Sequence, residues 1–186
     1  MQSEDPVERK RPDIVIRQME IDDLPSVYHL GERLFTSEEF PILYRTWDQF
    51  EVTDYFSSDS EYCLVAEVNG VIVGFVLATT IEKEGTAWKR YGYVAWMGVD
   101  DSFQRKRLGR RLYKKLEEEL LDDGVRMVIA DTEGGNADAI SFFKAVGFSP
   151  RSEHVWLAKT LRRPAKAPAK RRKARVASPE AVESTD

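Results

Sequence analysis

The chain has 186 residues, of which 42% are hydrophobic and 32% charged, with a formal net charge of −4. This length supports one domain with a hydrophobic core, and no apolar run approaches the ~20 residues that span a bilayer. Residues 1–11 are polar and lack the apolar stretch of a signal peptide. The single cysteine, Cys63, excludes an internal disulfide and a cysteine-rich metal site. We therefore expect a cytoplasmic protein without a metal.

Charge is unevenly distributed along the chain. Residues 160–176 carry eight Lys or Arg and no acid, and residues 177–186 carry three acids, so residues 1–159 have a net charge of −9. Segment 162–186 is poor in large apolar groups, which predicts a disordered basic tail, and residues 1–12 are expected to be flexible too. The tail either stays solvated, docks on the acidic body or contacts an anionic partner such as nucleic acid.

The first half of the predicted domain, which spans residues 13–161, alternates between strand and helix patterns. A strand begins at 14–16, and Asp22 or Asp23 is predicted to cap a helix that ends near Phe35. Residues 46–49 resemble a capping box that opens a second helix. Asn69-Gly70 then separates two β-rich segments, 62–68 and 71–81, which predicts a tight hairpin.

The second half continues the alternation. A strand over 93–99 leads through a basic loop into a helix that ends near Asp123, where Gly124 stops it. A strand at 125–131, a helix capped by Asn136 and a last strand near 155–157 follow. This order predicts an α/β (α+β) domain with a mixed, mostly antiparallel central sheet flanked by about four helices.

The basic loop before the helix is the most informative segment. It consists of Gln104, Arg105, Lys106, Arg107, Leu108, Gly109 and Arg110. The first amides of a helix have no acceptor within the helix, and the helix dipole favours an anion there. Cations at a helix start are unfavourable on their own, so their number also points to an anion. We predict that a pyrophosphate binds at this helix start.

Two motifs in the chain resemble those of the GNAT superfamily of acyl-CoA N-acyltransferases. The family's loop, Gln/Arg-x-x-Gly-x-Gly/Ala, matches Gln104–Gly109 except at Arg107. The family's later motif, Asn-x-x-Ala-x-x-apolar-Tyr-x-x-x-Gly-Phe, matches Asn136 to Phe148 except at Phe143. The resemblance covers residues 13–160 and is greatest to N-terminal protein acetyltransferases of the ribosomal-protein type.

The resemblance implies that acetyl-CoA is the co-substrate. The pantetheine arm would pair with the backbone of Met97 and Val99, on a strand that splays from its neighbour. The loop amides would hold the pyrophosphate, Asn136 would contact the pantetheine, and Phe143 would pack near the thioester sulfur. The expected cofactor-binding residues are Met97, Val99, Gln104, Arg105, Lys106, Arg107, Leu108, Gly109, Arg110, Asn136 and Phe143.

Two residues depart from the family pattern. Arg107 replaces a glycine, and because a positive φ would cost arginine ~1–2 kcal/mol, we expect a helical φ with the side chain turned outward. Phe143 replaces the tyrosine that protonates the leaving thiolate. We therefore expect slower turnover or another proton donor. The candidate donors are Tyr113, Tyr93, Ser141 and water.

Asp131 is the candidate general base, because its position matches the family's catalytic glutamate. The alternatives are Glu133 and Tyr93, or an Asp131 that is only held at a strand end by loop amides. Two histidines, His29 and His154, have no partner spacing and are interpreted as structural. Aromatic residues that either line an acceptor site or simply pack are Phe35, Phe40, Tyr44, Trp47, Trp88 and Tyr91.

The sequence thus predicts an N-acetyltransferase that moves acetyl from acetyl-CoA directly to a primary amine, without a covalent enzyme intermediate. The acceptor is left open between a protein N-terminus, a lysine and a small amine, and a homodimer is left open as well. The alternative is a non-catalytic acyl-CoA sensor whose basic tail contacts nucleic acid or a protein.

Overall fold

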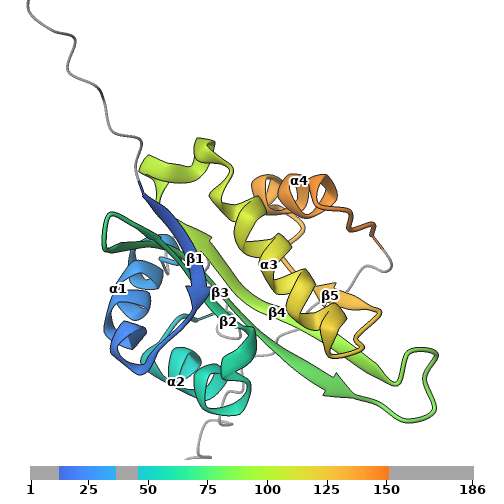
Figure 1. Cartoon of the computed structure of the whole chain (residues 1–186). Coiled ribbons are helices and arrows are strands. Elements are labelled where there is room, and N and C mark those ends of the chain that lie inside the picture. The colour runs from blue at the N-terminus through green and yellow to red at the C-terminus, as the bar shows by residue number, and fades with distance from the viewer. Residues whose placement is uncertain (1–12, 37–45, 151–186) are drawn as a thin grey trace, which may run out of the picture. The chain divides into compact units, whose positions relative to one another are not determined.

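The computed structural model describes residues 13–36 and 46–150 (Figure 1). Within them lies a five-stranded sheet in the order β1-β2-β3-β4-β5. Strands β1 to β4 pair antiparallel, and β5 pairs with β4 in parallel. The strands are β1 (Ile14–Gln18), β2 (Cys63–Val68), β3 (Val71–Glu82), β4 (Arg90–Val99) and β5 (Val128–Ala130). The predicted mixed, mostly antiparallel sheet is confirmed.

Helices cover both faces of this sheet. They are α1 (Leu24–Leu34), α2 (Gln49–Ser58), α3 (Leu108–Asp122) and α4 (Ala137–Ala145). Figure 1 shows α1 and α2 on one face and α3 and α4 on the other. Val27 and Leu30 of α1 pack with Phe75 in one core cluster, and Leu112 and Leu116 of α3 pack in the other. These apolar stripes follow the 3.6-residue period, which explains why the helices were predictable.

The β2–β3 turn follows the predicted hairpin. Asn69 has a φ of 50° and Gly70 a φ of 82°, as a two-residue turn with both residues in the left-handed region requires. Helix α3 also ends as predicted at Gly124, whose φ is 78°. The Val125 N–H donates to the Leu120 carbonyl at 2.9 Å in a Schellman motif. Val125 therefore belongs to the helix end, and β5 begins at Val128 rather than at the predicted 125.

Two predicted helix caps differ from the structure: Asp23 is the N-cap residue of α1 but gives no side-chain cap, and Thr46 is not the N-cap of α2. The Asp23 carboxylate makes no cap to α1, since it accepts hydrogen bonds from Arg17 Nη1 at 2.5 Å and Nη2 at 3.0 Å. Helix α2 is capped by Asp48, whose Oδ1 accepts from the amides of Phe50 and Glu51, so the cap lies two residues after Thr46. The predicted strand at 155–157 and the tail at 162–186 lie outside the described residues, as do residues 1–12.

No helix in the described part of the chain is long and apolar enough to cross a bilayer.

Candidate functional site

Strand β5 pairs with β4 over its whole length, but only residues 92–94 of β4 take part. Their pairs are Gly92 with Val128, Tyr93 with Ile129 and Val94 with Ala130, after which β5 ends and β4 continues to Val99. At the same point the register with β3 shifts, since Leu77 lies opposite Trp96 and Ala78 opposite Val94. Ala95 is therefore the extra residue of a bulge, which bends β4 where it parts from β5.

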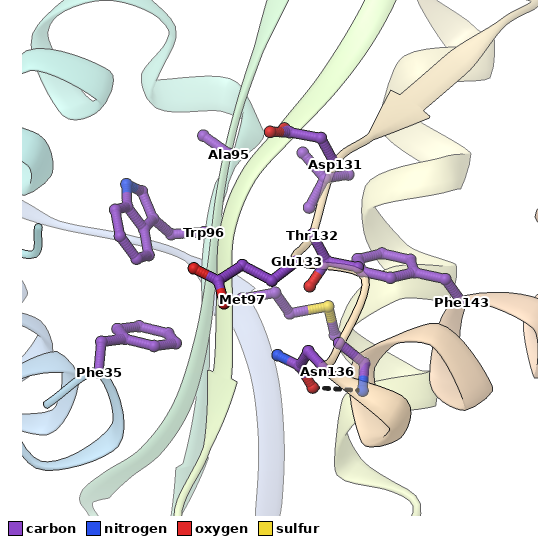
Figure 2. Close-up of a pocket in the computed structure, with 11 residues that line it drawn as sticks. Phe35, Ala95, Trp96, Met97, Asp131, Thr132, Glu133, Asn136 and Phe143 are labelled. Carbon is purple, nitrogen blue, oxygen red and sulfur yellow. Dashed lines mark hydrogen bonds between the residues drawn. The ribbon is translucent and has the colours of Figure 1, made fainter. Parts of the chain in front are cut away.

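A pocket lies where the two strands part. Figure 2 shows Phe35 and Trp96 on one side of β4, with Asn136 and Phe143 of the α4 region on the other. The described lining is Phe35, Val94, Ala95, Trp96, Met97, Asp131, Thr132, Glu133, Asn136, Ala139 and Phe143. The fold thus brings together four of the predicted site residues. The two that lie farthest apart in the sequence, Met97 and Phe143, are separated by 46 positions.

The start of α3 borders this pocket. The first backbone hydrogen bond of α3 runs from the Arg111 N–H to the Arg107 carbonyl at 3.1 Å. The amides of Leu108, Gly109 and Arg110 come before this bond and so have no acceptor within the helix. A Cβ at Gly109 would lie 3.2 Å from the Phe142 ring and 3.7 Å from Met97 Cε. The glycine therefore permits the close packing that puts the helix start beside the pocket wall.

Arg107 contradicts the prediction of a helical φ. Its φ is 61° and its ψ is 19°, a left-handed conformation, at the junction between the 3₁₀ turn Asp101–Lys106 and α3. Glycine adopts this left-handed conformation without a steric penalty, which explains why the family places glycine at this position. The Arg107 side chain is exposed, as predicted.

Two arginines in the first turn of α3 have partners within the protein. Arg110 Nη2 donates to the Ala145 carbonyl at 2.8 Å, where α4 ends, and Arg111 Nη2 donates to the Ile14 carbonyl at 3.3 Å. An anion is therefore not needed to explain these two cations. The side chains of Gln104, Arg105 and Lys106 lie outside the described part.

The remaining predicted cofactor residues have different surroundings. The Leu108 side chain is fully buried, so only its amide can face a ligand. Val99 does not line the pocket and packs instead beside Leu108 and Phe103. Asn136 Oδ1 accepts the Ala139 N–H at 3.0 Å and caps α4 as predicted (Figure 2). The two N–H groups of its carboxamide are what Asn136 can offer a ligand.

Asp131 follows β5 and faces the pocket mouth. Its Oδ1 accepts a hydrogen bond from the Tyr93 hydroxyl at 2.7 Å. Tyr93 lies on β4 in the last stretch that pairs with β5, so the sheet itself sets this contact. Two sequence candidates for acid–base chemistry are therefore one hydrogen-bonded pair.

Glu133, the weaker sequence candidate, also lines the pocket. Its Oε1 is buried and has no hydrogen-bond partner among the described residues. The Glu133 carbonyl accepts the Asn136 N–H at 3.0 Å, which fixes the turn before α4. A pattern of acids two residues apart at a strand end is the only sequence feature that points to both carboxylates.

Other candidates for proton transfer lie away from the pocket. Tyr113 is 4% exposed, its ring packs against Phe148, and burial raises its pKa to about 12. Ser141 is exposed on α4 and lines no part of the described pocket.

Burial raises the pKa of the Cys63 thiol to about 12, which makes it inert as a nucleophile, as predicted. His29 lies on the exposed face of α1, with Nδ1 2.8 Å from Glu32 Oε2.

Of the predicted acceptor-site aromatics, Phe35 lines the pocket and Trp47 is a core residue that donates to the Tyr28 carbonyl. Trp88 is 48% exposed in the β3–β4 turn, away from the lining. Phe40 and Tyr44 lie outside the described residues.

Comparison with known proteins agrees with this architecture. The sequence model of the Acetyltransferase (GNAT) family matches residues 24–148. The ribosomal protein bS18-alanine N-acetyltransferase of Escherichia coli (strain K12) is 28% identical over 136 residues, which cover 72% of this chain and 80% of that protein. This match confirms the resemblance to the ribosomal-protein type.

Solved structures share the fold. An aminoglycoside N-acetyltransferase, AAC(6')-Iy in complex with CoA, aligns with a TM-score of 0.66 at 18% identity, over 83% of this chain and all of that chain. Ard1 from Thermoplasma volcanium aligns with a TM-score of 0.62 at 22% identity, over 75% of this chain and 84% of that chain.

The family match runs from α1 to the turn after α4 and so includes every element that builds the pocket. The relatives therefore support an acetyltransferase and not the alternative of a non-catalytic acyl-CoA sensor. The chain belongs to the GNAT family of acetyltransferases and is an N-acetyltransferase that takes acetyl from acetyl-CoA to an amine.

Proposed function

We propose that the pocket between β4, β5 and α4 is the reaction centre and that the acceptor is the α-amine of a polypeptide. The observation that carries the catalytic assignment is the Tyr93–Asp131 hydrogen bond of 2.7 Å at the pocket mouth. A carboxylate in this position accepts the proton that the amine releases as its bond to the acetyl carbon forms. The Tyr93 hydroxyl orients the carboxylate by donating to Oδ1.

The residues at the α3 start and around the pocket suit acetyl-CoA as the co-substrate. Acetyl-CoA supplies the activated acetyl group when bound. The amides of Leu108, Gly109 and Arg110 would hold its diphosphate, since they precede the first backbone hydrogen bond of α3 and are not used within the helix. The Met97 and Val99 backbone would hold the pantetheine, together with the Asn136 carboxamide. Phe143 would place an apolar ring beside the sulfur.

The leaving thiol receives no proton from Phe143. A thiol with an ordinary pKa of ~8.5 leaves tolerably as a thiolate, and water can protonate it afterwards. The proposed reaction therefore needs a base but no side-chain acid.

The energetics of amine deprotonation favour an α-amine as acceptor. At pH 7 an N-terminal amine with a pKa of ~7.7–8.0 needs only about 1–1.4 kcal/mol to lose its proton, whereas a lysine amine needs about 4.6 kcal/mol. A single carboxylate at an exposed pocket mouth suits the smaller demand. The E. coli relative named above, which acts on an alanine of ribosomal protein bS18 by its name, supports the same acceptor class.

The test compares two peptides of the same sequence with acetyl-CoA, one with a free N-terminus and one with a blocked N-terminus and a free lysine. We expect acetylation of the first and little of the second. Preferential acetylation of the blocked peptide would refute the α-amine assignment.

In the same assay, Asp131→Asn should lower kcat by ~10²–10³-fold, because general base catalysis is lost. Tyr93→Phe should lower it by about 10-fold, the equivalent of one hydrogen bond. Asp138→Asn is the matched control, since Asp138 is exposed on α4 and outside the described pocket lining. Equal rates for the wild type and Asp131→Asn across pH would exclude Asp131 as the base.

We also expect cytoplasmic action, because Cys63 is a buried free thiol. The contact of the basic tail with an anionic partner and the homodimer stay predictions.

A further inference from the structure

The Glu133 carboxylate lines the pocket but has no part in the proposed transfer. Its Oε1 is buried and accepts no hydrogen bond from the described residues. Figure 2 shows its side chain extending across the pocket toward β4. A buried charged oxygen without a donor is unfavourable, so such a group calls for a donor from elsewhere. A bound ligand is one source of that donor.

The surroundings of Glu133 suit a positive charge. The described lining holds two carboxylates, Asp131 and Glu133, and contains no Lys, Arg or His. A further carboxylate, Glu51, lies behind the wall and accepts the Trp96 Nε1–H at 2.6 Å. The rings of Phe35 and Trp96, with centroids 4.9 Å apart, face the same pocket. Carboxylates beside aromatic rings stabilise an organic cation.

The reacting amine is not the cation that Glu133 should hold. This amine must be neutral when it attacks, and a carboxylate in contact with it would favour its protonated form. Asp131 already lies where the amine proton must go. The unsatisfied oxygen of Glu133 is therefore better matched to a second charge on the acceptor.

We propose that Glu133 is a specificity-determining residue that binds a cationic side chain, of Arg or Lys, close behind the N-terminus to be acetylated. This proposal rests on the proposed function, because it presumes a polypeptide acceptor. The net charge of −9 on residues 1–159 attracts the same class of acceptor at longer range.

The experiment uses the full chain, acetyl-CoA and peptides that differ only by Arg or citrulline, at position 2 in one pair and at position 3 in another. Citrulline keeps the shape of arginine without its charge, and neither side chain is an acetylation site. In the wild type, the Arg peptide of at least one pair should have a kcat/KM about 10-fold or more above its citrulline partner, through KM. Glu133→Gln should bring this ratio near 1.

The matched control is Glu84→Gln, which removes the same charge from an exposed site in the β3–β4 turn and should preserve the ratio. A ratio near 1 in the wild type for both pairs would overturn the proposal. So would a ratio that survives in Glu133→Gln, or an equal loss for Arg and citrulline peptides. If no peptide is acetylated at its N-terminus, the proposed function itself fails. N-terminal acetylation of the citrulline peptides tests that function separately, because these peptides lack the charge that Glu133 is proposed to bind.

Discussion

At the scale of single residues, Arg107 occupies a conformation that its side chain disfavours. Its φ is 61°, and a non-glycine residue there costs ~1–2 kcal/mol relative to glycine, part of which the greater flexibility of glycine in the unfolded chain offsets. Arg107→Gly should therefore raise the free energy of unfolding by about 0.5–1 kcal/mol in urea titrations. Arg107→Ala, which removes the charge but keeps the strain, should leave stability nearly unchanged. Equal stability of the two variants would show that the backbone stores no strain at this position.

Phe143 is the second residue whose identity limits the chemistry. Phe143→Tyr places a hydroxyl where the family has its acid, in a pocket that the ring already lines. We expect kcat to rise ~10–100-fold when chemistry is rate-limiting, the low end of what an acid contributes, because a thiolate leaves readily. Phe142→Tyr is the control, since Phe142 packs against Gly109 and is not among the described residues that line the pocket. A rate unchanged by Phe143→Tyr would mean that protonation of the thiolate does not limit turnover.

At the scale of elements, Gly31 lets the Trp47 ring lie directly against α1. A Cβ at Gly31 would fall 2.1 Å from Trp47 Cε2. Gly31→Ala should gain ~1 kcal/mol in helix propensity and lose more through overpacking, for a net loss of about 2 kcal/mol. Gly134→Ala, with open space around it and no positive φ, should stay within about 0.5 kcal/mol of the wild type in the same unfolding experiment. A stabilised Gly31→Ala would show that Trp47 can move away at no cost.

The Arg17–Asp23 pair joins β1 to the start of α1. Hydrogen bonds from Arg17 lower the pKa of the Asp23 carboxyl below its ordinary value. A lowered folded-state pKa means that the pair stabilises the fold above the unfolded pKa of ~3.9 and loses this contribution as pH falls below it. Asp23→Asn should cost about 1.5–3 kcal/mol at pH 7, and its deficit should shrink in unfolding measurements below pH ~4. Asp22→Asn, at an exposed neighbouring position, serves as control. A deficit that stays constant with pH would exclude an ionic contribution.

Which elements the sequence could predict depends on whether their determinants are local. The β2–β3 hairpin, the α3 end at Gly124 and the Asn136 cap each depend on residues within one turn of the chain. The roles of Asp23 and Arg110 were not predictable, because each is decided by a partner on another element of the fold. Arg110, for example, bonds to Ala145.

The site shows the same division. The co-substrate motifs are contiguous and could be read from the sequence, although the φ of Arg107 could not, since a glycine-preferring position is invisible when arginine fills it. The Tyr93–Asp131 contact joins residues 38 positions apart across a parallel pair of strands. The buried state of Glu133 Oε1 depends on packing around the pocket and has no sequence signature.

At the scale of the whole molecule, the sheet separates two tasks. Helices α3 and α4 lie on one face, where we propose that backbone amides bind an anion, while α1 and α2 lie on the other (Figure 1). Phe35 and Trp96 belong to the core cluster of α1 and α2. The pocket where β4 and β5 part connects the two faces. In our proposal, the anionic co-substrate and the cationic acceptor approach from opposite sides, which suits direct transfer in a ternary complex.

The central claim is that the α3 start binds the diphosphate of the co-substrate at the edge of this pocket. Backbone amide NMR during titration with coenzyme A tests it, with pantetheine, which lacks the diphosphate, as the comparison. We predict large shifts at Leu108, Gly109 and Arg110 with coenzyme A and small ones with pantetheine, while Met97 responds to both. Equal shifts at the α3 start with both ligands, or none with coenzyme A, would contradict the account.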